Sequence, residues 1–372
     1  MKDWLRLLRI SNLPTVWSSV LVPLAFAGGP RGVDFANPDT YLAVGVALVS
    51  ATCLYLAGMV LNDVLDLRID RMERPERPLP AGRINPRTAT AAGVSMLGVG
   101  AILPFGLGAA AGIAATSIAV AVVAYDALHL RTAWSTVLMG ICRGGIYVLS
   151  TLCLCSYYGW SDDIGFALAI FAAPMVIHVV GFSMVARHEV DNDPPISCPS
   201  CDYVVADSTV LCSECGASCE DSARRAKHEA RIEVYHQWWG TATMSLVLPF
   251  ALSLVVVLFL VAIMGGIGTF AYVAGMTAFS VLLVVAAVAI MGVAVVRGTR
   301  HLHRNPTAIG RFVLRSIRNI SLYDACILLF LLGIHSSTSS IGGPPASTSV
   351  VLALALGCYC ATMAAHRRIP GT

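Results

Sequence analysis

The chain has 372 residues, of which 56% are hydrophobic and only 13% are charged, and its formal net charge is +3. Soluble domains carry about a quarter charged residues, so this composition excludes an ordinary soluble protein. The arginines lie beside long apolar segments rather than on one basic face, which gives no indication of nucleic-acid binding.

Ten apolar segments are each near the length of about 20 residues that a helix needs to cross a bilayer. They cover residues 13–28, 41–62, 88–106, 109–126, 134–156, 164–186, 241–264, 269–296, 310–334 and 348–365. The ninth carries three arginines in its first turns, so the prediction is an all-α, multi-pass transmembrane bundle of nine to ten helices. The first segment lacks a convincing cleavage site and is expected to be a retained helix rather than a signal peptide.

The positive charges orient these segments. One side of the membrane receives Arg6, Arg9, Arg131 and the arginine-rich segments 68–83, 187–231, 297–318 and 367–368, whereas the other side receives Arg31 alone. Because loops that stay in the cytoplasm are rich in Lys and Arg, both termini are predicted to be cytoplasmic. The expected location is the cell's inner membrane, with the active site on the cytoplasmic side.

The chain divides into three predicted parts. Residues 1–186 and 238–372 form the two parts of the helix bundle, and residues 187–237 form a polar cytoplasmic loop between them. A second polar segment, residues 62–86, follows the second span. Both polar segments fall on the predicted cytoplasmic side, so function is expected there.

Four acidic or amide side chains recur at helical spacing after the second span. Asn62, Asp66 and Asp70 recur at i, i+4 and i+8, and Asp63, Asp66 and Asp70 at i, i+3 and i+7, so either set shares one helix face. Stacked like charges repel unless a cation bridges them, and Mg²⁺ prefers such oxygen ligands. The spacing predicts a magnesium site in which Asp63 also takes part. The alternative is a solvated loop beside the membrane.

A basic segment follows the acidic one. Its prolines are expected to end the helix and force an extended stretch before Asn85 and Pro86 start the next helix. Three arginines at its start supply positive charge for phosphate groups, namely Arg71, Arg74 and Arg77. The two segments together favour binding of an anionic headgroup at the membrane surface.

Several ionisable groups lie within or at the ends of apolar segments. Asp126, Arg143, His178 and Asp324 are costly in a bilayer and are expected to face a cavity or a partner. For His178 we expect a structural hydrogen bond between helices, and for Asp324 pairing with an arginine of its own segment is one interpretation. Two aromatic rings are candidates for stabilising a carbocation, Tyr125 and Tyr147.

Four cysteines in the loop have the spacing of a metal site. They form two C-x₂-C pairs separated by ten residues, namely Cys198, Cys201, Cys212 and Cys215. Four thiolates at this spacing predict a closed, structural Zn²⁺ site of the zinc-ribbon type. Iron in the same site, or thiols without metal, are the alternatives. A closed site has no open position for catalysis, so the ribbon is expected to order the loop or to dock a protein partner.

The acidic motif resembles the first aspartate-rich motif of the UbiA-type intramembrane prenyltransferase superfamily, N-D-x-x-D-x-x-x-D. Residues 74–83 are similar to the R-P-x-R-P stretch that follows it in the family. Three further stretches also resemble the family, namely residues 9–15 with Asn12, residues 125–131 with Tyr125 and Asp126, and residues 139–145 with Arg143.

The resemblance implies a helical bundle around a cavity and the transfer of a polyprenyl group from its diphosphate to an acceptor. It implies that Asn62, Asp66 and Asp70 hold catalytic Mg²⁺ on the diphosphate. It also implies substrate contacts by the three arginines and by Asn12, Tyr125, Asp126 and Arg143. The expected partners are a polyprenyl diphosphate, an unidentified acceptor and membrane lipid.

The family's second motif, D-x-x-x-D, is altered in this chain. After the sixth span only Glu189 and Asp193 have the i, i+4 spacing, which leaves a second magnesium site open. The acceptor is open as well, among phenolic quinone precursors, tetrapyrroles, sugar or glycerol phosphates and other lipids. A membrane carrier, or a catalytically silent scaffold that docks a partner on the ribbon, remain the alternative functions.

Overall fold

The computed structural model describes residues 2–26, 34–129, 131–159, 162–186, 309–338 and 346–368, with short pieces at 196–197, 200, 204–205, 215–216, 289 and 293. Within these ranges the chain is a bundle of helices, and a pair of two-residue strands is the only sheet. The prediction of an all-α, multi-pass bundle is therefore confirmed for the part of the chain that is described.

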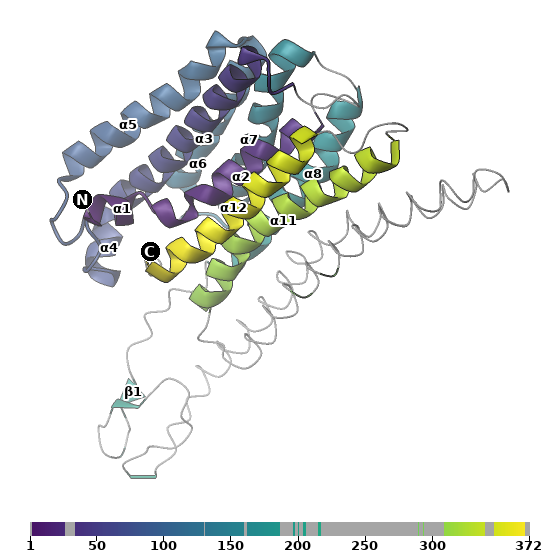
Figure 1. Ribbon diagram of the computed structural model, residues 1–372. Coiled ribbons are helices and arrows are strands. Elements are labelled where there is room, and N and C mark those ends of the chain that lie inside the picture. Colours follow the sequence, from purple (N-terminus) through teal and green to yellow (C-terminus); the bar gives the residue numbers. More distant parts are fainter. Residues whose placement is uncertain are drawn as a thin grey trace.

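The helices follow one another up and down the bundle (Figure 1). The first part comprises α1 Lys2–Leu7, η1 Ile10–Asn12, α2 Leu13–Leu21, η2 Val22–Ala25, α3 Pro38–Leu65 and α4 Leu67–Glu73. It continues with α5 Pro86–Ile102, η4 Leu103–Gly106, α6 Ala109–Leu128, α7 Ser135–Tyr158 and α8 Asp162–Ala186. The last two described helices are α11 Ile309–Thr338 and α12 Ala346–Arg368.

Eight of the ten predicted spans coincide with these helices, and the predicted spans at 241–264 and 269–296 lie outside the described residues apart from positions 289 and 293. Four described helices are long and apolar enough to cross a membrane, namely Pro38–Leu65, Pro86–Gly106, Ala109–Leu128 and Ser135–Tyr158. Large apolar side chains on their outer faces are exposed, including Tyr41 at 60%, Ile113 at 60% and Val120 at 63%. Such a surface suits lipid rather than water.

Two helices begin at an asparagine followed by proline. The side chain of Asn37 accepts a hydrogen bond from the amide of Asp39 at 2.9 Å, and Asn85 does the same for the amide of Arg87 at 2.9 Å. Each asparagine has extended backbone angles, and the proline after it takes the first helical position. The predicted start of a helix at Asn85 and Pro86 is therefore confirmed.

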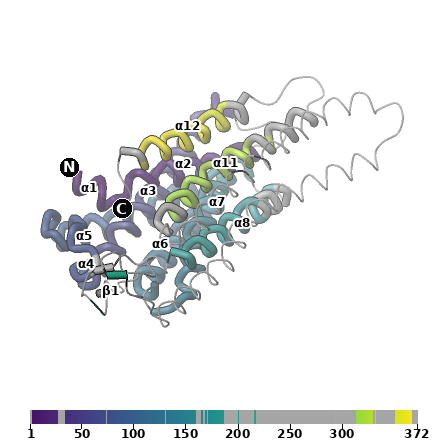
Figure 2. Tube along the Cα trace, turned by 90° about the horizontal axis from the view of Figure 1, so that it is seen from below, coloured from purple at the N-terminus to yellow at the C-terminus, as the bar shows by residue number. Residues whose placement is uncertain are grey.

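Glycines let neighbouring helices approach closely. A Cβ on Gly140 of α7 would lie 2.9 Å from the backbone oxygen of Val176 in α8, and one on Gly100 of α5 would lie 3.1 Å from the backbone nitrogen of Leu54 in α3. In a membrane the hydrophobic effect does not hold helices to one another, so their association depends on close packing. Small residues at the crossings allow this packing because they let the backbones approach. In the views of Figures 1 and 2, α2, α11 and α12 lie side by side and α7 lies beside α8.

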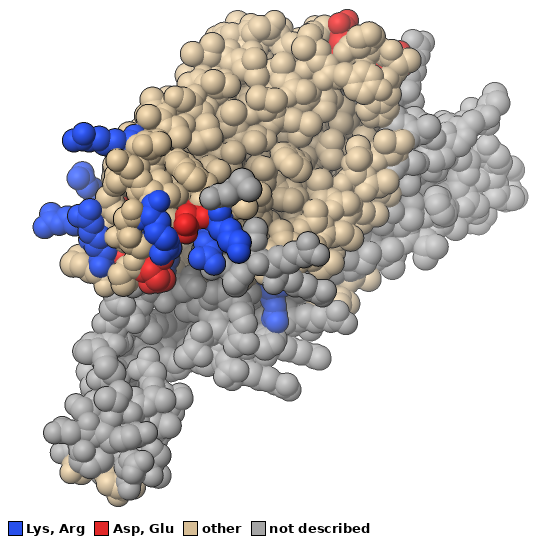
Figure 3. All heavy atoms as spheres, turned by 60° about the vertical axis from the view of Figure 1, so that its left-hand side comes forward, with Lys and Arg blue, Asp and Glu red and all other residues tan. Residues whose placement is uncertain are grey.

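Because successive helices run in opposite directions, the beginnings of some helices lie beside the ends of others. The beginnings of α2, α7 and α11 and the ends of α3, α6 and α8 lie at one end of the bundle, where α4 also lies (Figure 1). Among the described residues, Lys and Arg side chains gather at this end around a few carboxylates (Figure 3). We call it the polar end.

Candidate active site

A cavity of about 1060 Å³ opens at the polar end of the bundle. Its inner wall is apolar and its mouth is charged. The inner wall includes Leu54, Ile118, Val122, Ile146, Val179, Phe182, Val313 and Ile317, and the mouth includes Asn62, Asp66, Asp70, Arg74 and Arg77. A ligand with a long apolar tail and a polar head would match this division.

The acidic segment keeps one helical face through a short break. Helix α3 ends at Leu65, and α4 starts at Leu67. The amide of Asp66 bonds to the oxygen of Asn62 at 2.9 Å, and the amide of Asp70 bonds to the oxygen of Asp66 at 2.9 Å. Because the i→i−4 bonds continue, Asn62, Asp66 and Asp70 all line the cavity.

Asp63 is the member of the motif that does not line the cavity. It is 5% exposed and accepts a hydrogen bond from Nη2 of Arg9 at 3.0 Å, with Nη1 of Arg77 3.8 Å away. Of the two sets that the spacing allowed, the structure thus places the one with Asn62, and not the one with Asp63, on the cavity face. Asp63 holds an arginine of the mouth in place instead of facing the cavity itself.

Only two of the three predicted phosphate-binding arginines face the cavity. Arg74 and Arg77 line the cavity, whereas Arg71 is exposed on α4 and does not. Nη1 of Arg77 lies 2.7 Å from Oδ2 and 3.0 Å from Oδ1 of Asp70. The buried carboxylate of Asp70 is thereby neutralised.

The segment after α4 folds into successive turns rather than the extended stretch that its prolines led us to expect. The amide of Ala81 bonds to the oxygen of Arg77 at 3.0 Å, and that of Gly82 bonds to Leu79 at 3.0 Å. Gly82 has φ 71°, a conformation that glycine adopts without strain. Proline at the early positions of a turn is as compatible with its fixed φ as an extended chain is. The first turn, in which the amide of Arg77 bonds to the oxygen of Arg74 at 3.1 Å, places Arg77 beside Asp70.

Two further cavity residues lie at the end of α6. Nε2 of His129 lies 3.0 Å from Oδ2 of Asp66, and the ring of Tyr125 stacks on that of His129 with centroids 5.4 Å apart. The hydrogen bond to Asp66 raises the pKa of His129, although partial burial opposes the shift. Asp126 is 5% exposed and does not line the cavity. His129 was not identified from the sequence, although its spacing from Tyr125 places both on one helix face.

The segment before α2 contributes Arg9 and Asn12. Arg9 has φ 44° and ψ 46°, and Tyr55 donates a hydrogen bond to its backbone oxygen at 3.3 Å. Burial is the largest single influence on the pKa of Arg9 and lowers it, but the carboxylate of Asp63 and the side chains of Tyr55 and Tyr125 together hold this pKa above its ordinary value. Oδ1 of Asn12 lies 2.7 Å from Nε2 of His366, which comes from the end of α12. Apart from its place in the family-like stretch 9–15, no pattern in the sequence indicated that Arg9 lies in the mouth.

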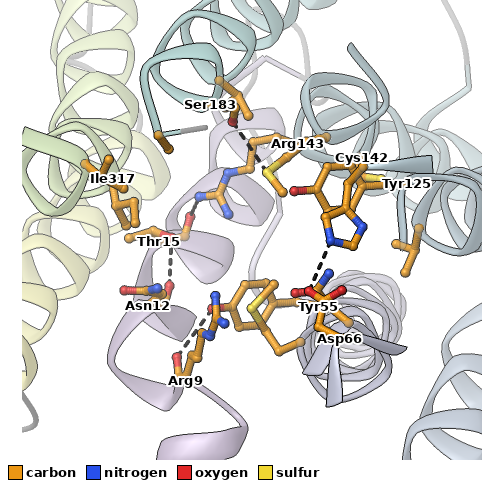
Figure 4. A pocket seen from close by; sticks show the side chains of 18 of the residues that line it. Arg9, Asn12, Thr15, Tyr55, Asp66, Tyr125, Cys142, Arg143, Ser183 and Ile317 are labelled. Atoms are coloured by element: carbon orange, nitrogen blue, oxygen red, sulfur yellow. Dashed lines mark hydrogen bonds and ion pairs between the residues drawn. The ribbon is translucent and has the colours of Figure 1, made fainter. Parts of the chain in front are cut away.

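Arg143 lies on α7, inside the cavity, and donates a hydrogen bond to the backbone oxygen of Thr15 (Figure 4). Tyr147, one turn further along α7, is fully buried and does not line the cavity, so it cannot offer its ring to a carbocation there. Its hydroxyl donates to Oδ1 of Asp324.

Two buried ionisable groups serve contacts between helices. The carboxylate of Asp324 also accepts hydrogen bonds from Ser18 at 2.5 Å and Ser19 at 3.0 Å, rather than from an arginine of its own helix as one interpretation held. Nε2 of His178 lies 3.2 Å from the backbone oxygen of Ser316, so the expected structural bond between helices is present.

The mouth offers oxygen ligands that suit Mg²⁺. Oδ1 of Asp66 is buried and has no hydrogen-bond partner. Buried oxygens are almost always paired, so a cation that binds there would supply the missing partner. Its other oxygen faces His129, and both oxygens of Asp70 face Arg77. Within the described ranges no three His, Cys, Asp or Glu side chains already form a metal-binding group. The carboxylates therefore fit magnesium. Asp70 would become available to the metal when the side chain of Arg77 moves from Asp70 to the phosphate.

Several predicted residues fall outside the part of the chain that is described. These are Glu189, Asp193, Cys198, Cys201 and Cys212. Strand β1, Ile196–Ser197, pairs antiparallel with β2, Val204–Val205, and the first cysteine pair lies between these strands in the sequence. Cys215 is exposed. The zinc site and the second magnesium site stay predictions.

Residues 13–210 match the model of the UbiA prenyltransferase family. A digeranylgeranylglyceryl phosphate synthase from Metallosphaera sedula is 34% identical over 103 residues, which cover 28% of this chain and 34% of that relative. The corresponding synthase from Saccharolobus solfataricus is 25% identical over 183 residues, which cover 48% and 56%. The chain thus spans about a third to a half of the length of these relatives.

The bundle also resembles a solved structure. A UbiA homolog from Aeropyrum pernix K1, determined in its apo state, superposes with a TM-score of 0.51 over 86% of this chain and 96% of that one, at 14% identity. At this identity the likeness concerns the fold. The helical fold is shared with that homolog, and the chain is a multi-pass membrane protein.

Proposed function

The chain belongs to the UbiA prenyltransferase family, and from this premise we propose that it transfers a polyprenyl group from a polyprenyl diphosphate to an acceptor within the membrane. One observation carries the proposal. At the mouth of a cavity whose inner wall is apolar, the carboxylates of Asp66 and Asp70 meet arginines from two separate segments. The diphosphate belongs at that mouth, and the prenyl tail belongs inside.

The mouth residues bind the head of the donor. Asn62, Asp66 and Asp70 would hold Mg²⁺, which neutralises the charge that develops on the leaving diphosphate. Arg74 and Arg77 line the same mouth and supply further positive charge. Before the donor binds, His129 and Arg77 neutralise Asp66 and Asp70, which keeps these carboxylates tolerable in a partly buried place.

The apolar wall separates the reacting carbon from water. The bond between C1 of the prenyl group and the diphosphate oxygen breaks, and its electron pair leaves with pyrophosphate. An electron-rich oxygen or carbon of the acceptor forms the new bond to C1, and the acceptor releases a proton. An allylic cation would react with water, so a cavity lined by Leu54, Ile118 and Val122 favours transfer over hydrolysis.

The polar end is proposed to face the cytoplasm. The basic residues of the described helices gather there, which agrees with the positive-inside pattern. Both the diphosphate and Mg²⁺ then enter from the aqueous compartment. The proposed location is the cell's inner membrane, with both termini on the cytoplasmic side.

The test is prenyl transfer by the purified full chain with labelled geranylgeranyl diphosphate, Mg²⁺ and a panel of acceptors that includes phenols and glycerol-phosphate lipids. Asp66→Asn and Asp70→Asn should each lower turnover by at least a hundredfold, because each removes charge from the metal site. The matched control is Asp39→Asn, at the opposite end of α3 and about 40 Å away. Product formation that survives both Asp66→Asn and Asp70→Asn would refute the assignment.

A further inference from the structure

Arg143 is a buried cation that lies apart from the arginines of the mouth. It is 8% exposed, lines the cavity, and uses its guanidinium for one hydrogen bond, to the backbone oxygen of Thr15. Its Nε is buried and has no hydrogen-bond partner. In Figure 4 the side chain reaches from α7 toward α2, across the cavity from Asp66.

No carboxylate of the described residues pairs with this guanidinium. Asp324 acts on it electrostatically, but the oxygens of Asp324 already accept hydrogen bonds from Ser18, Ser19 and Tyr147. A positive charge held inside an apolar bundle without a contacting anion is costly. The cost would be offset by a ligand that carries the missing negative charge.

The position of Arg143 suits the acceptor better than the donor head. Thr15 lies one helical turn, about 5 Å, further into the bundle than Asn12 at the start of α2. A diphosphate at the mouth directs C1 of the prenyl group inward, toward this level. An acceptor anchored on Arg143 would therefore approach this carbon from inside the cavity.

We propose that Arg143 forms a second anion site inside the cavity, which binds the carboxylate or phosphate of an acceptor. This inference rests on the proposed prenyl transfer and names the acceptor's chemical class. A guanidinium presents a planar fork of N–H donors that matches either group, and Nε belongs to that fork. Neutral acceptors leave the charge unmatched and are bound more weakly.

The experiment measures binding to the purified full chain with the mouth saturated by Mg²⁺ and pyrophosphate. The probes are benzoate, phenyl phosphate and benzyl alcohol, which share one ring and differ in charge, and isothermal titration calorimetry gives each affinity. The wild type should bind at least one of the two anions about tenfold or more tightly than the alcohol. Whichever of benzoate and phenyl phosphate binds more tightly shows whether the acceptor's anionic group is a carboxylate or a phosphate.

Arg143→Gln should reduce the preference for anions to about threefold or less and leave the affinity for Mg²⁺-pyrophosphate unchanged. Arg74→Gln is the matched control, because it removes an arginine of the mouth and should weaken pyrophosphate while leaving the anion preference intact. A wild type that does not prefer anions overturns the proposal. So does an Arg143→Gln variant that keeps the preference or that loses pyrophosphate instead.

Arg143 also joins α7 to α2, so Arg143→Gln can fail to fold. In that case Arg143→Lys keeps the positive charge but loses the fork, and its preference for phenyl phosphate should fall below that of the wild type. An unchanged preference contradicts the proposal. The pyrophosphate titration without probes tests the proposed function separately, because it depends on Asp66 and Asp70 and not on Arg143.

Discussion

Arg77 and Asp70 form a partly buried ion pair in which Nη1 of the arginine lies within 3.0 Å of both carboxylate oxygens. The same Nη1 lies 3.8 Å from Oδ1 of Asp63. One arginine thus covers two carboxylates of the acidic segment. Mg²⁺, alone or bound to phosphate, would compete with Arg77 for these carboxylates. Removal of Arg77 should therefore have opposite effects on the binding of free Mg²⁺ and of Mg²⁺-pyrophosphate.

Arg77→Gln should strengthen the binding of Mg²⁺ alone, because Asp70 loses the cation that neutralises it. The same variant should weaken the binding of Mg²⁺-pyrophosphate by about tenfold or more, since a charge-assisted contact to phosphate is lost. Titration calorimetry measures both affinities. Arg71→Gln, on the exposed face of α4, should change neither. Equal effects of the two substitutions would contradict the assignment of Arg77 to the mouth.

Gly140→Ala should destabilise the protein by about 1 to 3 kcal/mol, because the added Cβ would lie 2.9 Å from the backbone oxygen of Val176 and force α7 from α8. Gly98→Ala, on α5, is the control, because nothing lies within 4 Å of the added Cβ and alanine favours the helix. Thermal unfolding in detergent, followed by size-exclusion chromatography, measures both. A Gly140→Ala variant as stable as Gly98→Ala would show that the two helices are not so closely packed.

Asp324→Ala should cost about 2 to 3 kcal/mol, because it leaves the hydroxyl of Tyr147 without its buried acceptor and leaves Ser18 and Ser19 with the backbone oxygen of Thr15. Tyr147→Phe removes one donor and should cost about 1 kcal/mol. Since the two residues share a hydrogen bond, the double variant should lose less stability than the sum of the single losses. Strict additivity, measured by denaturation in mixed micelles, would argue against the contact.

The purified protein should contain about one Zn²⁺ per chain, bound by the four cysteines of the loop. Elemental analysis measures the metal and distinguishes zinc from iron. Cys212→Ser should abolish the stoichiometric metal, whereas Cys360→Ser, on α12 and exposed, should leave it unchanged. Zinc content that is unaffected by Cys212→Ser would eliminate the predicted site.

The local pattern of the sequence was sufficient for several elements. Apolar length placed the helices, because a span needs about 20 residues to cross a bilayer. Asn85 followed by proline marked the start of α5, because side-chain capping and a fixed φ act within a few residues. The i, i+4 repeat of Asn62, Asp66 and Asp70 placed three groups on one face, because helical geometry is the same wherever the helix lies.

Tertiary structure decided which partner each charged group has. The spacing allowed Asp63 on the acidic face as readily as Asn62, and only the packing of the first segment, which brings Arg9 to 3.0 Å from Asp63, separated the two. His129 reached Asp66, and Asp324 reached Ser18, across 63 and 306 residues of chain. Helical periodicity relates residues a few positions apart, whereas these contacts depend on how whole helices pack, and no local pattern contains that information.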